Sequence, residues 1–134
     1  MVNPVTWRFE SGFFSEPERY AIVFLSVFFI ILGQGANLMI KHIVFFKLKD
    51  RSPESVAKTV AVLRNMDGKI PQLVSLEVGA DVIRSDRSFD IALVSVVASL
   101  EDLQAYQVHP AHQEVIKHIN EVKELSVSVD YEIE

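Results

Sequence analysis

The chain has 134 residues, 49% of them hydrophobic, and a formal net charge of −5. This length suits one domain with a hydrophobic core and is too short for two domains of ordinary size. The acidic balance argues against a nucleic-acid partner, because phosphate recognition needs clustered lysine and arginine, and the 13 present are scattered among acidic residues. No cysteine is present, which excludes disulfide bonds and thiol chemistry.

Residues 1–38 differ in composition from the rest of the chain and are expected to lie outside the folded domain. Six of the nine phenylalanines occur here, and residues 21–32 form an apolar run. As a helix that run would span only about 18 Å, well short of the ~30 Å hydrocarbon core of a membrane. A secretory leader and an N-terminal anchor are two interpretations of this segment.

A third interpretation is that translation starts at Met39. Residues 34–36 (Gln-Gly-Ala) can be encoded by a purine-rich stretch that resembles a bacterial ribosome-binding site, shortly before the codon of Met39. We therefore expect a bacterial protein whose N-terminal extension is a start-site artefact, with the leader and the anchor as alternatives.

From residue 39 onward the chain shows a regular succession of short elements. Residues 40–48 are rich in β-branched and aromatic side chains and predict a strand. The Ser-Pro-Glu sequence at 52–54 is typical of a helix start, with a hydroxyl cap, a proline and an acidic residue in the first turn. Apolar residues at helical spacing continue this helix to about Asp67, and Gly68 closes it.

Two further strands and a second helix follow. Residues 74–79 alternate between apolar and polar side chains, and residues 90–98 are apolar almost throughout. The polar turn between them predicts a hairpin. Ser99 is a suitable cap for the second helix, and Pro110 is expected to interrupt and restart it.

Residues 125–133 carry the most regular strand pattern in the chain, with strict alternation of apolar and polar side chains. The predicted order is therefore βαββαβ. This order is typical of an α+β, ferredoxin-like fold, in which a four-stranded antiparallel sheet carries both helices on one face.

The other face of such a sheet lacks a helical cover. The strands at 40–48 and 90–98 are nevertheless apolar on both faces, which a face open to water does not favour. We expect a second copy of the chain to cover it, forming a homodimer whose two sheets meet as a dimeric α/β barrel. Cover by the N-terminal segment, or simple tolerance of exposed apolar residues, are the alternatives.

Two stretches of sequence resemble a known family. The residues MIKHIVFFKLK at 39–49, the βαββαβ order and YQVHPAH at 106–112 are similar to the stress-responsive dimeric α/β-barrel (Dabb) family. The resemblance covers residues 39–134 and leaves 1–38 unmatched. It implies a ferredoxin-like homodimeric barrel, and the family includes plant stress proteins, bacterial proteins of unknown role and a polyketide cyclase.

The resemblance also implies site residues. The cyclase uses a tyrosine and a histidine in a Tyr-x-x-His-Pro-Ala-His segment, and these match Tyr106 and His112 position by position. A histidine on its first strand matches His42. A further histidine on its third strand is replaced here by Ile91.

The chemistry of these side chains agrees with such a role. With an ordinary histidine pKa of about 6.5 and a tyrosine pKa of about 10, His112 can accept a proton at neutral pH while Tyr106 donates a hydrogen bond to a carbonyl or enolate oxygen. His42 lies among apolar neighbours, and we expect it to bind a small ligand in a cleft between the sheet and the helices. His109 is a second candidate ligand-binding residue.

Structural interpretations of the same residues stay open. His109 can cap the helix that restarts at Pro110, and His112 can bond to His42 or to a backbone carbonyl. A metal site built from His109 and His112 is disfavoured, because no cysteine or clearly placed carboxylate completes a ligand set. No motif for a phosphate, flavin or haem is present, so we expect no cofactor.

Three function classes remain. The first is a cytoplasmic, stress-associated homodimer of unknown specific activity that binds a small ligand in the sheet–helix cleft. The second is a cofactor-independent cyclase or lyase in which His112 and Tyr106 transfer protons. The third is a cofactor-free monooxygenase, which the fold permits. For residues 39–134 we expect no membrane association.

Overall fold

The computed structural model describes residues 38–134. The predictions made for the N-terminal extension, namely a leader, an anchor or a start at Met39, lie outside the described residues. The described chain contains four strands and three helices, in the order β1 (Met39–Leu48), α2 (Pro53–Arg64), β2 (Leu73–Ala80), β3 (Ile91–Val97), α3 (Leu100–Val108), α4 (Pro110–Val122) and β4 (Lys123–Ile133).

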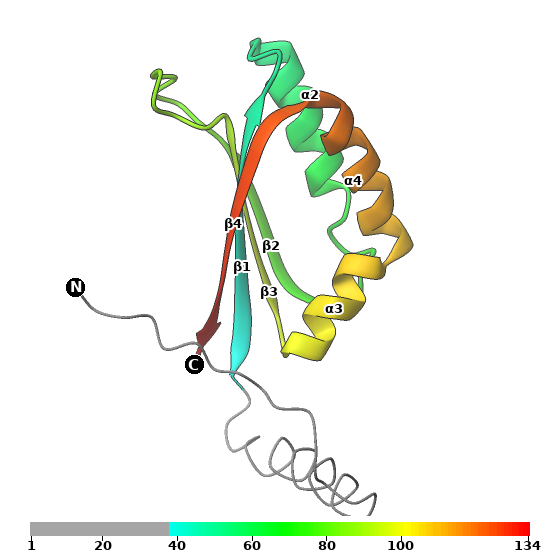
Figure 1. Ribbon diagram of the computed structural model, residues 1–134. Coiled ribbons are helices and arrows are strands. Elements are labelled where there is room, and N and C mark those ends of the chain that lie inside the picture. Colours follow the sequence, from blue (N-terminus) through cyan, green and yellow to red (C-terminus); the bar gives the residue numbers. More distant parts are fainter. Residues whose placement is uncertain (1–37) are drawn as a thin grey trace, which may run out of the picture. The chain divides into compact units, whose positions relative to one another are not determined.

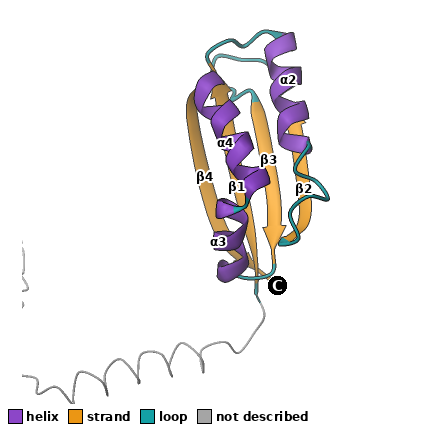
Figure 2. Cartoon of the chain, turned by 90° about the vertical axis from the view of Figure 1, so that its right-hand side faces the viewer, coloured by secondary structure: helices purple, strands orange, loops and turns teal. Residues whose placement is uncertain are grey.

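This arrangement confirms the predicted α+β, ferredoxin-like fold. The four strands form one antiparallel sheet in the order β2-β3-β1-β4. All three helices cover the same face of the sheet (Figures 1 and 2). The core lies between these two layers and consists of aliphatic side chains from both, such as Leu48, Leu63, Val97 and Ile119.

Local sequence explains where the helices begin and end. The Ser52 side chain accepts a hydrogen bond of 3.3 Å from the backbone N–H of Ser55 and so caps α2. Helix α2 ends at Arg64, before the predicted Asp67, and Gly68 occupies the turn that follows with a φ of 73°, which favours glycine.

The predicted interruption of the second helix is confirmed. Helix α3 ends at Val108 and α4 begins at Pro110, which lacks the N–H that a continuous helix would need. His109 lies between the two helices in an extended conformation (φ −62°, ψ 138°). The break allows α3 and α4 to follow different directions over the sheet (Figure 2).

The register of the sheet decides which side chains face the helices. His42 is opposite Ser95 on β3 and Asp130 on β4, and directly opposed residues point to the same face. On β4 the polar residues therefore face the helix side, and the apolar residues face away from it. Residues on the outer face include Leu125, Val127, Val129 and Tyr131, which are between 43% and 61% exposed.

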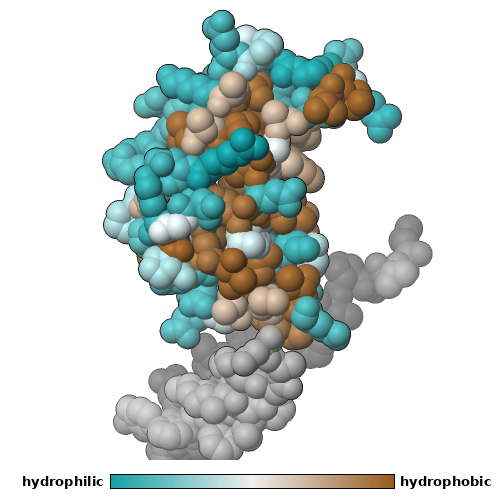
Figure 3. Space-filling view, turned by 180° about the vertical axis from the view of Figure 1, so that it is seen from behind, coloured by the Kyte–Doolittle hydropathy of each residue, from teal (hydrophilic) through white to brown (hydrophobic). Residues whose placement is uncertain are grey.

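Within residues 38–134, the outer face of the sheet is consequently apolar and is not covered by another element. Phe45 on β1 adds to it with 42% exposure. The view from behind, toward the β2 edge of the sheet, shows a further band of hydrophobic residues along the domain and a separate hydrophobic cluster at the tip of the loop between β2 and β3 (Figure 3). Val82 and Ile83 in this loop are 86% and 76% exposed.

Candidate functional site

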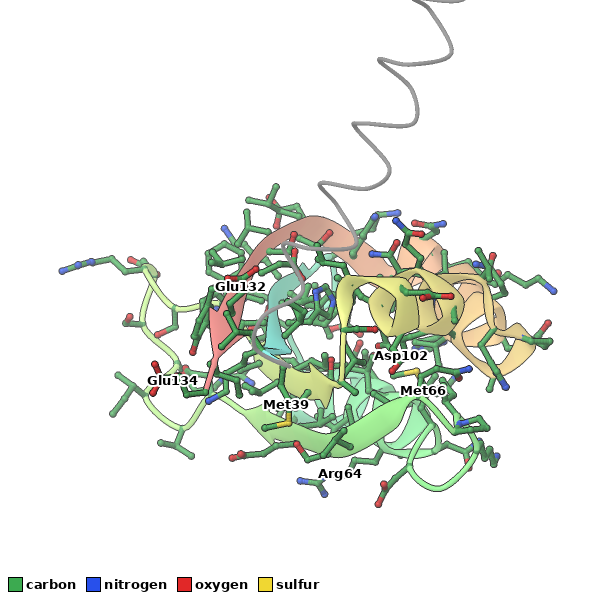
Figure 4. All side chains as sticks on the ribbon, turned by 90° about the horizontal axis from the view of Figure 1, so that it is seen from below. Met39, Arg64, Met66, Asp102, Glu132 and Glu134 are labelled. Carbon is green, nitrogen blue, oxygen red and sulfur yellow. The ribbon has the colours of Figure 1, made fainter. Side chains whose placement is uncertain are left out.

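A cleft of about 430 Å³ lies between the inner face of the sheet and helices α3 and α4. Figure 4 looks along the strands and shows the side chains that fill the space between the two layers, among them the labelled Met66. The walls are mostly apolar, and the polar residues that line the cleft are His42, Tyr106, Gln107, His112, Gln113, Lys123, Ser126 and Ser128. Such a volume and lining suit a small organic ligand.

His42 forms one side of this cleft from β1. It is 8% exposed, and its Nδ1 lies 2.5 Å from Oδ1 of Asp130 on the neighbouring edge strand. Since a carboxylate only accepts, Nδ1 carries the proton and donates a hydrogen bond to Oδ1 of Asp130. In the neutral imidazole this bond selects the tautomer in which Nε2 carries the lone pair.

Tyr106 enters the cleft from α3 and is almost fully buried, at 1% exposure. Its ring centroid lies 6.1 Å from that of His42 and 4.4 Å from that of His112. Burial raises the pKa of Tyr106 to about 12, partly offset by the adjacent Ser95 hydroxyl. The Ser95 Oγ itself is buried and lacks a partner of hydrogen-bonding geometry within residues 38–134, so its contact with the phenol is a weak one. The phenol is therefore protonated at neutral pH and can donate to a ligand.

His112 faces the same space from the first turn of α4. Its Nδ1 lies 3.0 Å from the carbonyl oxygen of Gln107, so Nδ1 donates and Nε2 is the unprotonated nitrogen. Burial lowers the pKa of His112 below its ordinary value. The hydrogen bond to the Gln107 carbonyl raises the pKa in part, and the nearby His42 and His109 lower the pKa further. His112 is thus a neutral imidazole that can accept a proton.

The other two positions singled out in the sequence lie elsewhere. His109 is not among the residues that line the cleft. Its Nδ1 accepts a hydrogen bond of 3.1 Å from the N–H of Ala111 and caps α4, as the structural interpretation predicts. A ligand-binding role for His109 stays a prediction. Ile91 is 1% exposed, packs in the core and is also absent from the lining of the cleft.

A family model decides the relationship of this chain to known proteins. Residues 40–133 match the model described as Stress responsive A/B Barrel Domain, or Dabb. The chain belongs to the Dabb family. The resemblance of the first strand and of YQVHPAH to this family is thereby confirmed.

Individual relatives of this Dabb domain agree with that assignment. The chain is 35% identical over 78 residues to the uncharacterized protein SCO4036 of Streptomyces coelicolor, a match that covers 56% of this chain and 80% of the relative. A dimeric protein of unknown function and ferredoxin-like fold from Bacteroides fragilis is 33% identical, with a TM-score of 0.62 and coverage of 71% and 96% of the two chains.

A third relative has a named activity. The hydroxynitrile lyase from Passiflora edulis is 24% identical, with a TM-score of 0.63, and the alignment covers 74% of this chain and 96% of the lyase. At this identity the likeness establishes the fold of the Dabb domain alone.

One residue that supports the Dabb cleft was missed by the sequence analysis. Asp130 does not line the cleft, but it is the partner of His42, 88 residues away in the sequence. The strict alternation in the last strand contained part of the signal, because it placed Asp130 on the same face as Ser126 and Ser128. The pairing of β4 with β1 supplied the rest.

Within the described part of the Dabb domain, no three or more His, Asp or Glu side chains group together in a way that could hold a metal ion. A search of the same residues finds no helix with the length and hydrophobicity needed to span a membrane.

Proposed function

We propose that this Dabb domain binds a small carbonyl compound in the sheet–helix cleft and catalyses cofactor-independent proton transfer, in the manner of a cyclase or lyase. One observation carries the proposal: a neutral histidine, His112, and a protonated tyrosine, Tyr106, lie side by side in the cleft with 4.4 Å between their ring centroids. A base and a hydrogen-bond donor at this spacing are the two groups that enolisation requires.

The proposed step begins at the carbon next to the ligand carbonyl. Nε2 of His112 accepts the proton from that carbon, and the C–H electron pair forms the carbon–carbon double bond of an enolate. The negative charge develops on the former carbonyl oxygen, which accepts a hydrogen bond from the Tyr106 hydroxyl. If the enolate carbon then attacks a second carbonyl, the oxygen of that carbonyl takes the proton back from His112, and a ring is closed without a cofactor.

His42 and Asp130 have a positioning role in this proposal. Asp130 holds Nδ1 of His42, so Nε2 of His42 can accept a hydrogen bond from a hydroxyl group of the ligand. Among the residues that line the described cleft, none favours the monooxygenase alternative over proton transfer.

We further propose that the domain works as a homodimer joined through the outer face of the sheet. Four residues of β4 and Phe45 of β1 expose apolar side chains on this face, and a large exposed apolar patch is rare on a monomer. The Bacteroides fragilis relative is described as dimeric, which supports a dimeric state for this domain. A cytoplasmic location stays a prediction.

Hydrogen exchange at carbon tests the proposed reaction. The protein is incubated in D₂O with a panel of β-polyketo and aromatic keto acids, and loss of α-proton signals is followed by NMR. We expect Tyr106→Phe and His112→Gln each to lower the rate of exchange by roughly 10²–10³-fold. His118→Gln is the control, since His118 bonds to Thr59 outside the cleft.

Binding without chemistry has a different outcome in the same experiment. If a ligand shifts the ring signals of His42 and His112 but its α-protons exchange no faster than in buffer, the domain is a binding protein and the catalytic proposal is wrong. If no compound of the panel shifts these signals and no α-proton exchanges faster than in buffer, the cleft histidines have a structural role alone.

A further inference from the structure

The cleft has two chemically different ends. At one end lie His42, Tyr106 and His112, and at the other lies Lys123, the first residue of β4. On β1, His42 and Leu48 are six residues apart, and Leu48 is opposite Lys123. Six residues of a strand span roughly 20 Å, so the two ends are separated by the length of an extended molecule.

An irregularity in the sheet turns Lys123 toward the cleft. The register of β1 with β4 shifts between Lys47 and Leu48, so that Lys47 is opposite Leu125 and Leu48 is opposite Lys123. Glu124 is the extra residue of this bulge. In a regular strand Lys123 would share the outer face with Leu125, but the bulge places it on the inner face with Leu48. Bulges commonly redirect a side chain beside a functional site.

The ammonium group of Lys123 is not neutralised by the protein. Across residues 38–134, no carboxylate oxygen lies within 4 Å of its Nζ. The adjacent Glu124 lies 4.0 Å from Lys47 instead. A partly buried cation that lines a cleft and lacks an acidic partner favours an anionic ligand group at that place.

The wall between the two ends is mostly apolar, and Ser126 and Ser128 of β4 are its polar members. The apolar part is formed by side chains from the sheet, from α2 and the turn that follows it, and from α4, namely Val44, Phe46, Leu63, Met66, Leu93, Val115, Ile116 and Ile119. A ligand that reaches from one end to the other therefore needs an apolar body.

We propose that the cleft selects elongated oxo acids, with a carbonyl group beside Tyr106 and His112, an aliphatic body along the apolar wall, and a carboxylate bound by Lys123. This inference rests on the proposed function, because that function supplies the position of the carbonyl group. Lys123 is then the residue that determines specificity for charge, whereas His112 and Tyr106 act on the carbonyl end.

A purely structural role for Lys123 predicts something else. Lys123 is the C-cap residue of α4, and a cation near the carboxyl end of a helix stabilises the helix. In that case its replacement lowers the stability of the domain and leaves the preference between charged and neutral ligands unchanged.

Binding of matched acids and amides separates these roles. The probes are 5-oxohexanoate, 7-oxooctanoate and 9-oxodecanoate, each compared by calorimetry with its own primary amide. For the wild type we expect at least one acid to bind about tenfold more tightly than its amide, as a charge-assisted hydrogen bond implies. Lys123→Met should remove this preference and leave the affinity for the amide within about twofold, while Lys123→Arg should retain it.

Lys49→Met is the matched control, because Lys49 is exposed and bonds to the Glu121 carbonyl near the same end of α4, outside the cleft. It should retain the preference for the acid. Circular dichroism checks the fold of each variant, and Lys123→Gln provides a second neutral variant should Lys123→Met be unstable.

Three results would overturn the inference: equal affinity for acid and amide in the wild type, an undiminished preference in Lys123→Met, or no binding of any probe. Failure of the proposed function has a separate signature. The acid would then bind with the expected dependence on Lys123, but its α-protons would not exchange in D₂O.

Discussion

Association through the outer face of the sheet can be tested with one charged residue. Val129 lies on β4 opposite Ile43, points away from the helices and is 61% exposed. Full burial of a valine side chain contributes ~1.5–3 kcal/mol, so burial of the exposed part in a dimer contributes roughly 1–2 kcal/mol per protomer. A twofold axis places the residue in the interface twice, so Val129→Asp should cost about 2–4 kcal/mol of association free energy.

This cost corresponds to an increase in the dimer Kd of about 30- to 700-fold. Burial of the new carboxylate would add to it. Sedimentation velocity over a range of protein concentrations measures the change, and circular dichroism verifies that each protomer is folded. Because Val129 is already exposed in the single chain, the fold itself should be retained.

Leu100→Asp is the matched control for this prediction. Leu100 is 60% exposed, close to the 61% of Val129. Leu100, however, is the first residue of α3 and belongs to the helical layer. An acidic residue is favoured at the amino end of a helix, so the variant should fold and dimerise normally. The reasoning is refuted if Val129→Asp and Leu100→Asp have the same dimer Kd, or if the wild type sediments as a monomer at micromolar concentration.

Three further predictions concern the cleft. Burial lowers the pKa of His112, so between its ordinary pKa of 6.5 and the lower native value the unfolded chain binds more protons than the native state. The unfolding free energy should therefore decrease as the pH is lowered through that window, and urea denaturation at several pH values should show a smaller decrease for His112→Gln. Tyr106, whose pKa is raised to about 12, should ionise in a late phase of an alkaline absorbance titration, and a late phase that persists in Tyr106→Phe would contradict this. Leu63→Ala, at a position 1% exposed, should lower the unfolding free energy by ~2–5 kcal/mol in denaturant titrations; a loss below 1 kcal/mol would mean that the cleft wall collapses to fill the space.

The sequence was sufficient to predict the elements of the fold because each one carries a local signal. A hydroxyl cap and a proline marked the start of α2, Pro110 marked the break between α3 and α4, and alternation marked β4. These signals depend on a few neighbouring residues and on the geometry of the backbone. They do not depend on which elements pack together.

The arrangement of the cleft depends on long-range strand pairing and was therefore harder to predict from the sequence. Alternation in β4 predicted two faces, one apolar and one polar, but not which of them would face the helices. An isolated domain would bury the apolar face beneath its helices. Here the polar face lies on the helix side, which places Asp130 beside His42 and leaves the apolar face exposed. The bulge at Glu124 could not be predicted from the sequence either, because it is defined only by the pairing of β4 with β1.

The same register shows where the third-strand histidine of the cyclase pattern, replaced here by Ile91, would lie in the sheet. Ile91 is opposite Phe46, four residues along β1 from His42, so a histidine at this position would lie roughly 13 Å from the row formed by Ser95, His42 and Asp130. Its replacement therefore removes no group from the end that holds Tyr106 and His112. Isoleucine at position 91 keeps the inner face of the sheet apolar around Phe46. Phe46 lies between the groups proposed to transfer a proton and the lysine proposed to bind a carboxylate. The departure from the cyclase pattern thus argues for a different, more extended ligand, and leaves the proton-transfer groups in place.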